Sequence, residues 1–446
     1  MDNTIKRYKD FLNKGKTERE CVKEIIALSK EKGYKDIESV KELKAGDKVY
    51  YSQYGKAIAL FNIGTEDIEK GLNILGGHID SPRLDIKMNP LYESDGIVYL
   101  DTHYYGGVKK YQWVTLPLAL HGVVCKTNGE KIEVTIGEDE DDTALCIADL
   151  LPHIAQEQMK KTASEFIPGE DLDLVVGLDD TEKKESEDEE KKEKEAGKKR
   201  ILSILKDRFG IEEKDFLSAE LEVVPAGKAR DLGLDRSMVL SYGQDDRVCS
   251  FTSLDAMLES NNPKRTACCL LMDKEEIGSV GATGMDSLFL ENAAAEVLSK
   301  MGKTSMLSLR RTLRNSMMLS SDVSAAYDPM YSSLFDKKNA SYLARGVVFN
   351  KYTGSRGKSG ASDANAEFMG KIRAAMEKAG VQYQMGEMAK VDVGGGGTIA
   401  KFAAYYGMQV IDCGVPVLSM HAPWEITAVK DVLSAKACYK AFLDIE

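Results

Sequence analysis

Histidine and tryptophan are scarce in this chain, with five and two among its 446 residues. The eight cysteines show no Cys-x-x-Cys spacing, and Cys268 and Cys269 lie inside an apolar run. This usage is typical of reduced, buried thiols in a cytoplasmic protein, and it argues against a disulfide framework. No Gly-x-Ser-x-Gly elbow or Cys/His signature is present, so a covalent catalytic route has no support in the sequence.

Long apolar runs and excess positive charge are missing as well. No segment reaches the roughly 20 apolar residues of a membrane span, and the charged residues 1–20 lack the apolar core of a signal peptide. The formal net charge is −12. Because nucleic acids and anionic membranes attract basic surfaces, we expect neither as a partner, and we expect a cytoplasmic location.

The residues that are present indicate a soluble globular protein with more than one domain. The length exceeds the usual size of a single core, and 43% hydrophobic and 30% charged residues are ordinary proportions. Patterns of consecutive strands fill the middle of the chain, whereas helical and strand patterns alternate on either side. We therefore predict an α/β domain made of residues 1–99 and 234–446, into which a mainly β domain, residues 100–233, is inserted.

Local signals place several elements. Asn128-Gly129 predicts a hairpin turn, and residues 3–32 have helical spacing interrupted before Thr17, which is predicted to cap a second helix with Glu20 completing the capping box. Residues 179–200 are almost all charged and predict a solvated loop or an exposed helix. Ser362 or Asp363 is the predicted cap of a later helix.

The stretch from Thr266 to Gly284 carries the most informative pattern. An apolar run predicts a buried strand at 267–272, and two adjacent carboxylates, Glu275 and Glu276, follow before a glycine-rich turn. Open α/β sheets place their ligand crevices at the carboxyl ends of their strands. Two neighbouring carboxylates at such a position can have different roles, because one can bind a metal while the other faces a bound water. The alternative is a solvated Glu-Glu pair on a loop.

Other polar residues also adjoin predicted core elements. His78 ends an apolar strand after two glycines, and Asp80, two residues on, projects to the same side in an extended segment and can hold the second imidazole nitrogen. Asp245 opens a helix, Asp322 follows a strand, and His421 ends another apolar run. The alternatives are a surface histidine near a turn for His78 and ordinary helix capping for Asp245.

Two histidines and three carboxylates can bind two divalent ions with one carboxylate bridging. Imidazole and carboxylate ligands suit Zn²⁺, with Mn²⁺ or Co²⁺ as possible substitutes. Two such ions about 3.5–4 Å apart acidify a shared water and polarise a carbonyl. Hydrolysis then needs a base that is not itself a ligand, and Glu275 fits that role.

The remaining motifs are less specific. His121, inside an apolar run, is predicted to be a core histidine, and spacing leaves the roles of His103 and His153 open. The run Gly394–Gly397 lacks the lysine of a nucleotide-binding loop. We predict instead that a turn including Gly396, Gly397 and Thr398 lines a substrate cleft.

Five segments together resemble the aspartyl aminopeptidase family of co-catalytic metallo-aminopeptidases. They read GGHIDSPRLD, QDDRVCSF, DKEEIGSVGATG, SSDVSAAYDP and SMHAPWE, and they follow the family's order over nearly the whole chain. The resemblance implies a three-layer α/β/α catalytic domain with an inserted dimerisation domain, assembled as a tetrahedral dodecamer. Its implied substrates are peptides.

The resemblance also implies a role for each site residue. His78, Asp245 and Asp322 would hold one zinc ion, and Asp245, Glu276 and His421 the other. Asp245 rather than Asp246 would bridge, because the family places its bridging ligand first in the pair. Asp80 would orient His78, and Glu275 would be the general base.

Two departures concern the preferred N-terminal residue. Relatives that prefer acidic residues carry a histidine shortly after the position of Asp322, where this chain has Ser324, Ala325 and Ala326. Their pocket lysine falls near Asn350-Lys351. The sequence is closer to the aminopeptidase I branch, whose vacuolar member favours leucine-like residues, so both neutral and acidic preferences stay open.

The sequence therefore predicts a two-zinc aminopeptidase. A different two-metal hydrolase, such as a deacylase, is the rival enzyme. The alternative non-enzymatic function is that of a metal-stabilised assembly protein without activity. The complete set of ligands and the presence of Glu275 argue against it.

Overall fold

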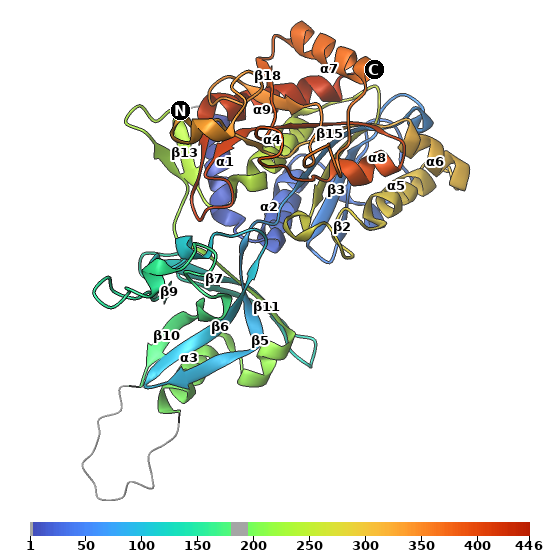
Figure 1. Ribbon diagram of the computed structural model, residues 1–446. Helices are drawn as coiled ribbons and strands as arrows, with labels where there is room; N and C mark the ends of the chain where they lie inside the picture. The colour runs from blue at the N-terminus through green and yellow to red at the C-terminus, as the bar shows by residue number, and fades with distance from the viewer. Residues whose placement is uncertain (1–2, 180–194) are drawn as a thin grey trace, which may run out of the picture. The chain divides into compact units, whose positions relative to one another are not determined.

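The computed structural model describes residues 3–179 and 195–446, so that part of the charged segment predicted at 179–200 lies outside the described residues. Two compact units divide the chain (Figure 1). The first comprises Met1–Ser81, Lys228–Met420 and Trp424–Glu446, and the second comprises Pro82–Gly227 with His421–Pro423.

The first unit is built on a nine-stranded mixed sheet. Its strands, in spatial order, are β1 (Lys35–Asp36), β2 (Lys48–Gln53), β3 (Ala57–Asn62), β14 (Ala267–Met272), β4 (Asn73–His78), β15 (Met317–Ser320), β19 (Gln409–Gly414), β17 (Val347–Asn350) and β18 (Tyr383–Met385). The central strands β14, β4, β15 and β19 run parallel to one another. Their carboxyl ends therefore meet at one edge, where α/β sheets form ligand sites.

The predicted strand at 267–272 is confirmed as β14, and its side chains show why an unbroken apolar run suits a central strand. All six residues of β14 are buried. Cys269 and Leu271 join one hydrophobic cluster, whereas Leu270 and Met272 join the other. Successive side chains of a strand point to opposite faces, so both faces of the sheet are covered.

Helices pack on both faces of the sheet, so the unit has three layers, helix–sheet–helix. Side chains from α1 (Asn3–Lys14), α2 (Glu18–Glu31), α4 (Gln244–Glu259), α7 (Ala366–Ala379) and α9 (Val429–Leu443) belong to one cluster. Those from α5 (Phe289–Lys300), α6 (Met306–Arg314) and α8 (Ala400–Tyr405) belong to the other, and Figure 1 shows these three helices together. The α/β fold expected from the sequence is confirmed.

A smaller five-stranded sheet completes the first unit. Its strands are β12 (Arg230–Leu232), β13 (Met238–Ser241), β21 (Glu425–Ala428), β20 (Pro416–Leu418) and β16 (Ser324–Ala325). Its strand β13 lies just before α4, which carries Asp245, and its strand β16 begins two residues after Asp322. The sheet thereby fixes the chain before the first of these candidate site residues and after the second.

The second unit is a seven-stranded antiparallel sheet with one α-helix, α3 (Ala196–Phe209), in its described part. The strands, in spatial order, are β8 (Lys131–Ile136), β7 (Leu118–Cys125), β11 (Ala219–Pro225), β5 (Arg83–Ser94), β6 (Ile97–Tyr105), β10 (Leu174–Leu178) and β9 (Cys146–Ile147). The unit begins at Pro82 because β5 pairs with β6 and β11. The hairpin predicted at Asn128-Gly129 joins β7 to β8, and Gly129 has a φ of 88°.

Capping explains one confirmed and one wrong helix boundary. Thr17 caps α2, and its side chain and that of Glu20 form the predicted capping box. The prediction that α7 is capped by Ser362 or Asp363 is wrong, because Asn365 accepts the backbone N–H of Phe368 at 2.8 Å. Asp363 instead pairs with Lys351 and Lys358 at 2.9 and 3.0 Å.

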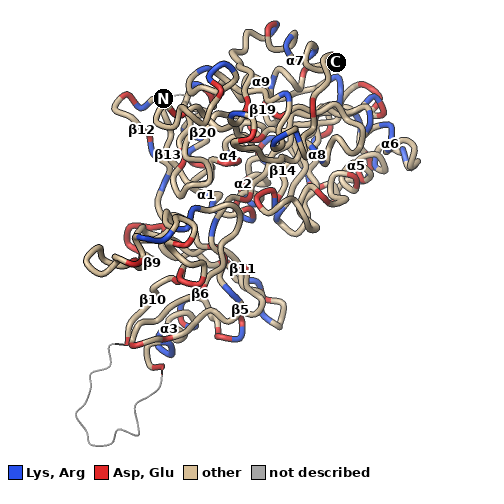
Figure 2. The backbone as a smooth tube through the Cα atoms, in the orientation of Figure 1, with Lys and Arg blue, Asp and Glu red and all other residues tan. Residues whose placement is uncertain are grey.

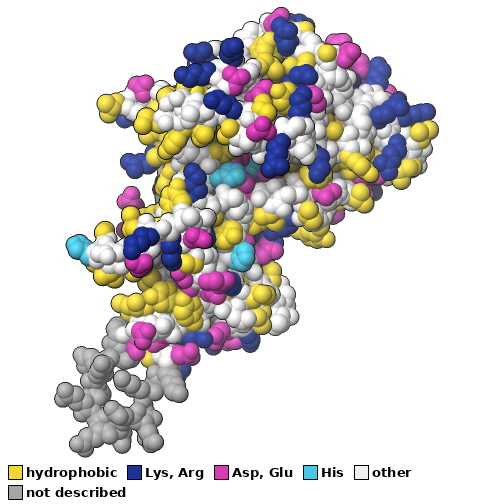
Figure 3. Space-filling model, in the orientation of Figure 1, with side chains coloured by type: hydrophobic (Ala, Val, Ile, Leu, Met, Phe, Trp, Pro, Cys, Tyr) yellow, Lys and Arg dark blue, Asp and Glu magenta, His cyan; other side chains and the backbone are white. Residues whose placement is uncertain are grey.

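Charged residues of both signs are interspersed along the elements (Figure 2) and on the face drawn in Figure 3, where no continuous basic surface is visible among the described residues. None of the helices in the described part of the chain has both the length and the apolar character needed to cross a membrane.

Candidate metal centre and adjoining pocket

Three parallel strands deliver candidate ligands to one edge of the nine-stranded sheet. His78 is the last residue of β4 and stands in register with Met272, the last residue of β14. Glu276 follows β14 after a short turn, and Asp322 follows β15 by two residues. Because the strands are neighbours and point the same way, residues far apart in sequence converge there.

Helix α4 brings two further carboxylates, Asp245 and Asp246, to the same place. The hydroxyl of Ser250 donates to the carbonyl oxygen of His78 at 2.6 Å, and the N–H of His78 donates to Asp246 at 3.3 Å. A Cβ added to Gly77 would lie 2.8 Å from the Asp246 carboxylate. Glycine is therefore required for α4 to approach β4 this closely.

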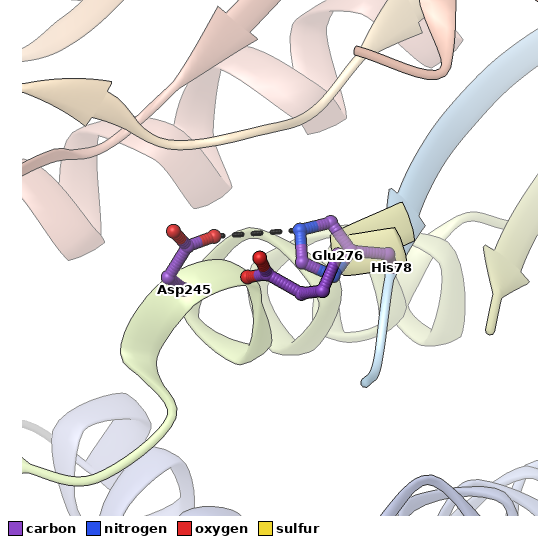
Figure 4. A group of neighbouring side chains, drawn as sticks. All are labelled: His78, Asp245 and Glu276. Carbon is purple, nitrogen blue, oxygen red and sulfur yellow. Dashed lines mark ion pairs between the residues drawn. The ribbon is translucent and has the colours of Figure 1, made fainter. Parts of the chain in front are cut away.

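Asp245 is fixed by its own backbone. Its N–H donates to the carboxylate of Glu425 at 3.0 Å, and its carbonyl oxygen accepts the hydroxyl of Ser81 at 2.7 Å. Both partners are buried. These contacts leave the Asp245 carboxylate directed toward His78 (Figure 4).

The distances around His78 match a metal centre. Its Nε2 lies 3.3 Å from Oδ1 of Asp245 and 3.8 Å from Oδ1 of Asp322. His78, Asp245 and Glu276 can offer three ligand atoms within 4.8 Å of one another, and so can His78, Asp246 and Asp322. Figure 4 shows the first trio, with the carboxylates of Asp245 and Glu276 turned toward the imidazole.

Asp80 links the imidazole to the segment after β14. Its Oδ1 is 3.2 Å from Nδ1 of His78. The same carboxylate accepts the backbone N–H groups of Glu275 and Glu276, at 3.1 and 3.2 Å. A single buried carboxylate thus holds a candidate ligand and the start of the short 3₁₀ helix η8 (Glu275–Ile277), so that their relative positions are coupled.

The pKa values reflect an excess of buried negative charge. Burial, helped by the nearby carboxylates of Asp322, Asp80 and Asp245 and opposed by His78, raises the pKa of Glu275 to about 8. Burial lowers the pKa of His78, but its contacts with Asp245, Asp322 and Asp80 outweigh this and hold it well above its usual range. Burial also raises the pKa of Asp246.

This arrangement fits bound cations. Asp80, Asp245, Asp246, Glu275, Glu276 and Asp322 gather around one imidazole, and like charges in a buried place repel strongly unless a cation compensates them. Oδ1 of Asp246 is buried and accepts no hydrogen bond from the described residues. The mixture of imidazole and carboxylates is the donor set of zinc and related metals.

His421 belongs to neither trio of candidate ligands. It lies in the second unit, where its Nδ1 is 2.9 Å from the carbonyl oxygen of Gly107. Its role as a ligand stays a prediction. His121 is buried with Nε2 3.1 Å from Glu138, as expected of a core histidine. His103 and His153 are exposed.

A cavity of about 370 Å³ borders Asp322. Two residues of the predicted substrate turn, Gly396 and Thr398, line it, whereas Gly397 is not among its lining residues. The role of this turn in binding substrate stays a prediction. Asn350 also lines it, but the neighbouring Lys351 does not. The register of β17 therefore decides which of these two residues faces the cavity.

Two residues near the site, Glu425 and Asp412, are not among the predicted site residues. Glu425, which accepts the N–H of Asp245, is the last residue of the SMHAPWE segment, so the sequence did contain a signal for it. Asp412 sits inside a strand that reads as core. Burial raises its pKa to about 7, although the hydroxyls of Thr398, Ser320 and Thr353 lower it.

Comparison with known proteins found a matching family model and similar proteins. Residues 11–443 match the family described as aminopeptidase I zinc metalloprotease (M18). A protein of Clostridium acetobutylicum named probable M18 family aminopeptidase 1 is 53% identical over 445 residues, which cover 98% of this chain and 94% of that protein.

Solved structures show the same fold. The crystal structure of an M18 aminopeptidase from Thermotoga maritima is similar with a TM-score of 0.94 and 42% identity, covering 99% of this chain and 96% of that one. The S. cerevisiae mApe1 dodecamer matches with a TM-score of 0.77 and 21% identity, covering 99% and 96% of the two chains. The latter likeness shows the fold alone.

Proposed function

The chain belongs to the aminopeptidase I zinc metalloprotease (M18) family, a family of hydrolases that act on peptides, and on this premise we propose that it uses two zinc ions to remove N-terminal residues. The observation that carries the proposal is the convergence of His78, Asp245, Glu276 and Asp322 at one sheet edge, beside a carboxylate that is not needed as a ligand, Glu275.

Each metal has an assigned set of ligands. In the proposal His78, Asp245 and Asp322 would hold one ion, and Asp245, Glu276 and His421 would hold the other, with Asp245 common to both sets. The short contacts of His78 with Asp245 and Asp322 support the first set. Zinc is the metal named for the family, and Mn²⁺ or Co²⁺ are alternatives with the same ligand preferences.

The protein's own groups carry the proton transfers. Bound cations would polarise the scissile carbonyl and acidify a water molecule. The Glu275 carboxylate would accept one proton of the attacking water and give it to the departing amine, which also receives the water's second proton, so the peptide bond is replaced by a carboxylate and an ammonium group. Asp80 keeps the base and His78 in register through its hydrogen bonds to both segments.

The substrate is proposed to lie with its first peptide carbonyl at the metals and its backbone against the turn of Gly396, Gly397 and Thr398. Gly396 and Thr398 border the cavity beside Asp322, which supports this placement. A deacylase using the same chemistry would act on N-acyl amino acids instead of free amino termini.

The decisive experiment compares Glu275→Gln with wild type. We expect kcat on aminoacyl p-nitroanilides to fall by roughly 10²–10⁴-fold, the usual contribution of a general base, while the zinc content measured by atomic emission is unchanged. Glu296→Gln, an exposed glutamate on α5, is the matched control. Unchanged turnover in Glu275→Gln would exclude Glu275 as the base, and hydrolysis of N-acyl amino acids alone would favour the deacylase.

A second variant tests the bridge. Asp245→Asn weakens the ligand shared by both ions, so we expect it to retain less than one equivalent of zinc after dialysis. Retention of two equivalents would contradict the assignment.

We also propose that the protein self-associates, as a dodecamer built from dimers through the second unit, and that it is cytoplasmic. The fold shared with the mApe1 dodecamer supports the first point. The eight cysteines show no spacing typical of a disulfide framework, which suits a reducing compartment. Native mass spectrometry should show an assembly with twelve times the mass of one chain. A stable monomer would contradict the proposal.

A further inference from the structure

We propose that Lys56, at the tip of the β2–β3 hairpin, is a positioning residue for the loop that carries Glu275 and Glu276. This loop comprises residues 273–284 and directly follows β14. The inference deepens the proposed aminopeptidase function and rests on it. Lys56 acts on the loop through Asp273 and is itself neither a ligand nor the base.

The loop needs support from outside because two of its residues adopt a backbone conformation that side chains disfavour. Lys274, directly before Glu275, has a φ of 68°, and Ser279 has a φ of 62°. Glycine, and less often asparagine and aspartate, are the residues that adopt this left-handed region routinely. Other residues stay there only where the surrounding structure holds them. The position of Glu275 therefore depends on the contacts that hold the loop.

Asp273 closes the loop at its base. Its N–H donates to the carbonyl oxygen of Thr283 at 3.1 Å, and its Oδ2 accepts the hydroxyl of the same residue at 2.6 Å. Asp273 is buried, and its Oδ1 accepts no hydrogen bond from the described residues. A buried carboxylate needs a positive charge nearby to compensate it.

Lys56 supplies such a charge. The antiparallel register that pairs Leu271 of β14 with Ile58 of β3, continued by two residues, brings Lys56 opposite Asp273. Nζ of Lys56 lies 3.9 Å from Oδ2 of Asp273 and 3.0 Å from Oε1 of Glu18, a buried residue at the start of α2. One cation thus lies between two buried carboxylates that would otherwise repel each other.

The charge of Asp273 depends on this cation. Burial, helped by the carboxylates of Glu18 and Asp80, raises the pKa of Asp273 to about 6. Lys56 and the hydroxyl of Thr283 limit this rise. Removing Lys56 would therefore favour a neutral Asp273 and would take a cation away from the buried Glu18.

A second lysine near Asp273 cannot replace Lys56. Nζ of Lys274 lies 3.8 Å from the same oxygen, but its side chain is 27% exposed, against 13% for that of Lys56. Water and salt screen the more exposed charge more strongly. Lys274 also belongs to the loop itself, so its contact does not tie the loop to another element.

The hairpin that carries Lys56 is fixed in its turn. Tyr54 and Gly55 have φ values of 54° and 64°, as expected of a two-residue hairpin turn in which both central residues are left-handed. Arg19, near the start of α2, donates from Nη1 to the carbonyl oxygen of Tyr54 at 2.8 Å. The tip of the hairpin is thereby held against α2 and can anchor the loop.

The hairpin contacts the loop at both ends. Lys56 reaches Asp273 at its first residue, and Gln53 of β2 donates from Nε2 to the carbonyl oxygen of Ala282 at 2.8 Å near its last. Between these points, Asp80 accepts the two backbone N–H groups at the start of η8. The proposed base and its neighbouring ligand are thus held by two separate elements.

Lys56→Met is the principal test, because methionine has a similar length and no charge. With zinc-loaded protein and the best substrate of an aminoacyl p-nitroanilide panel, we expect kcat to fall by roughly 10–100-fold, since a misplacement of about 1 Å can cost about 100-fold. KM should stay close to wild type, because Lys56 does not contact substrate. Lys56→Arg keeps the charge and should retain most of the kcat.

Lys70→Met is the matched control. Lys70 is an exposed lysine that pairs with Glu66 at 3.5 Å, and it precedes β4 at the end of the strand opposite His78. Its replacement by methionine should leave kcat and KM at their wild-type values. A fall in kcat as large as that of Lys56→Met would show a general effect of lost surface charge and would overturn the inference.

Amide hydrogen exchange of the metal-free protein gives a second readout, which does not depend on activity. Peptides covering residues 273–284 should exchange faster in Lys56→Met than in wild type, and close to the wild-type rate in Lys56→Arg and Lys70→Met. If Lys56 served only general stability, Lys56→Met would lower the melting temperature but would leave kcat and loop exchange unchanged well below that temperature.

These outcomes separate the inference from the proposed function. Wild-type kcat and wild-type loop exchange in Lys56→Met would overturn the inference and leave the aminopeptidase intact. Absence of hydrolysis by wild type on the whole panel would refute the proposed function, and loop exchange would then decide whether Lys56 orders the loop. If Lys56→Met fails to fold, its combination with Glu18→Gln removes the cation and a buried charge together and is tested by the same measurements.

Discussion

At the scale of single residues, Asp80 couples two parts of the site that sequence alone treats separately. One carboxylate contacts His78 and receives the backbone N–H groups of Glu275 and Glu276. Partners that hold a ligand in this way commonly change metal affinity or activity by roughly 10–100-fold when they are replaced. The sequence suggested the contact with His78 through a spacing of two, but it contained no sign of the two amides.

We predict that Asp80→Asn lowers kcat by roughly 10–100-fold. The amide retains the shape but replaces one acceptor oxygen by a donor, which faces the N–H groups of η8 unfavourably. Steady-state kinetics with zinc analysis measure the effect. Asp10→Asn, at a half-buried carboxylate on α1 that pairs with Lys6, is the control. Equal kinetics for the two variants would show that the hydrogen bonds of Asp80 do not contribute to turnover.

Some residues of the site can be predicted from the sequence and others cannot. His78, Asp245, Glu276 and Asp322 each stand where an apolar pattern begins or stops, so periodicity finds them. Asp412 lies within a predicted strand and has no such marker. Its place beside the cavity depends on neighbours across the sheet, which sequence spacing does not reveal.

At the scale of elements, capping places helix α2. Thr17 accepts the N–H of Glu20 at 3.2 Å, and Glu20 accepts the N–H of Thr17 at 3.1 Å. These bonds satisfy donors that a helix start otherwise leaves unpaired. Because the bonds are local, the pattern of Thr17 and Glu20 was sufficient to predict them.

Thr17→Ala should destabilise the protein by about 1 kcal/mol, the usual cost of losing an N-cap, as measured from the midpoint of urea unfolding. Thr17→Ser keeps the capping oxygen and should lose much less. If the serine variant loses as much as the alanine variant, the methyl group and its packing, rather than the cap, stabilise this position.

Helix α9 contains a buried carboxylate whose charge is costly. Asp431 accepts the N–H groups of Ala344 and Gly346 at 2.6 and 2.7 Å, yet burial raises its pKa to about 6. A folded-state pKa above the unfolded value near 3.9 means that the folded state binds the proton more tightly. Its stabilising contribution is complete at low pH and is lost as pH rises through 6.

We predict that the stability of wild type relative to Asp431→Asn falls by about 1 kcal/mol between pH 5 and pH 8. The constant cost of changing the two hydrogen bonds cancels in this comparison of pH values, so only the titration remains. Urea unfolding at both pH values measures it. Asp444→Asn, exposed at the end of the same helix, is the control, and a slope common to both variants would contradict the assignment.

At the scale of the whole molecule, the metal centre joins segments from across the chain. Its candidate carboxylates, grouped around His78, are Asp80, Asp245, Asp246, Glu275, Glu276 and Asp322. Bound cations would relieve their mutual repulsion, and a ligand that binds only the folded state stabilises that state by mass action.

We therefore predict that chelation with 1,10-phenanthroline abolishes hydrolysis and lowers the melting temperature by several degrees, since about 1 kcal/mol corresponds to ~2–4 °C for a domain of this size. Zinc in slight excess should restore both, whereas Mg²⁺, which prefers an all-oxygen site, should not. If neither chelation nor added zinc changes the melting temperature, then metal binding to these carboxylates does not stabilise the folded protein.

The sequence by itself determined what is local or periodic: the buried strand 267–272, the cap at Thr17, the hairpin at Asn128-Gly129, and the candidate ligands at the ends of apolar runs. These depend on side chains within a few residues of one another, where backbone geometry fixes the spacing. Only the tertiary structure decided that Asp80 holds η8, that Asn350 rather than Lys351 faces the cavity, and that Asp412 lies beside it. Those facts depend on strand register and on which strands are neighbours, and both are set by packing between segments hundreds of residues apart.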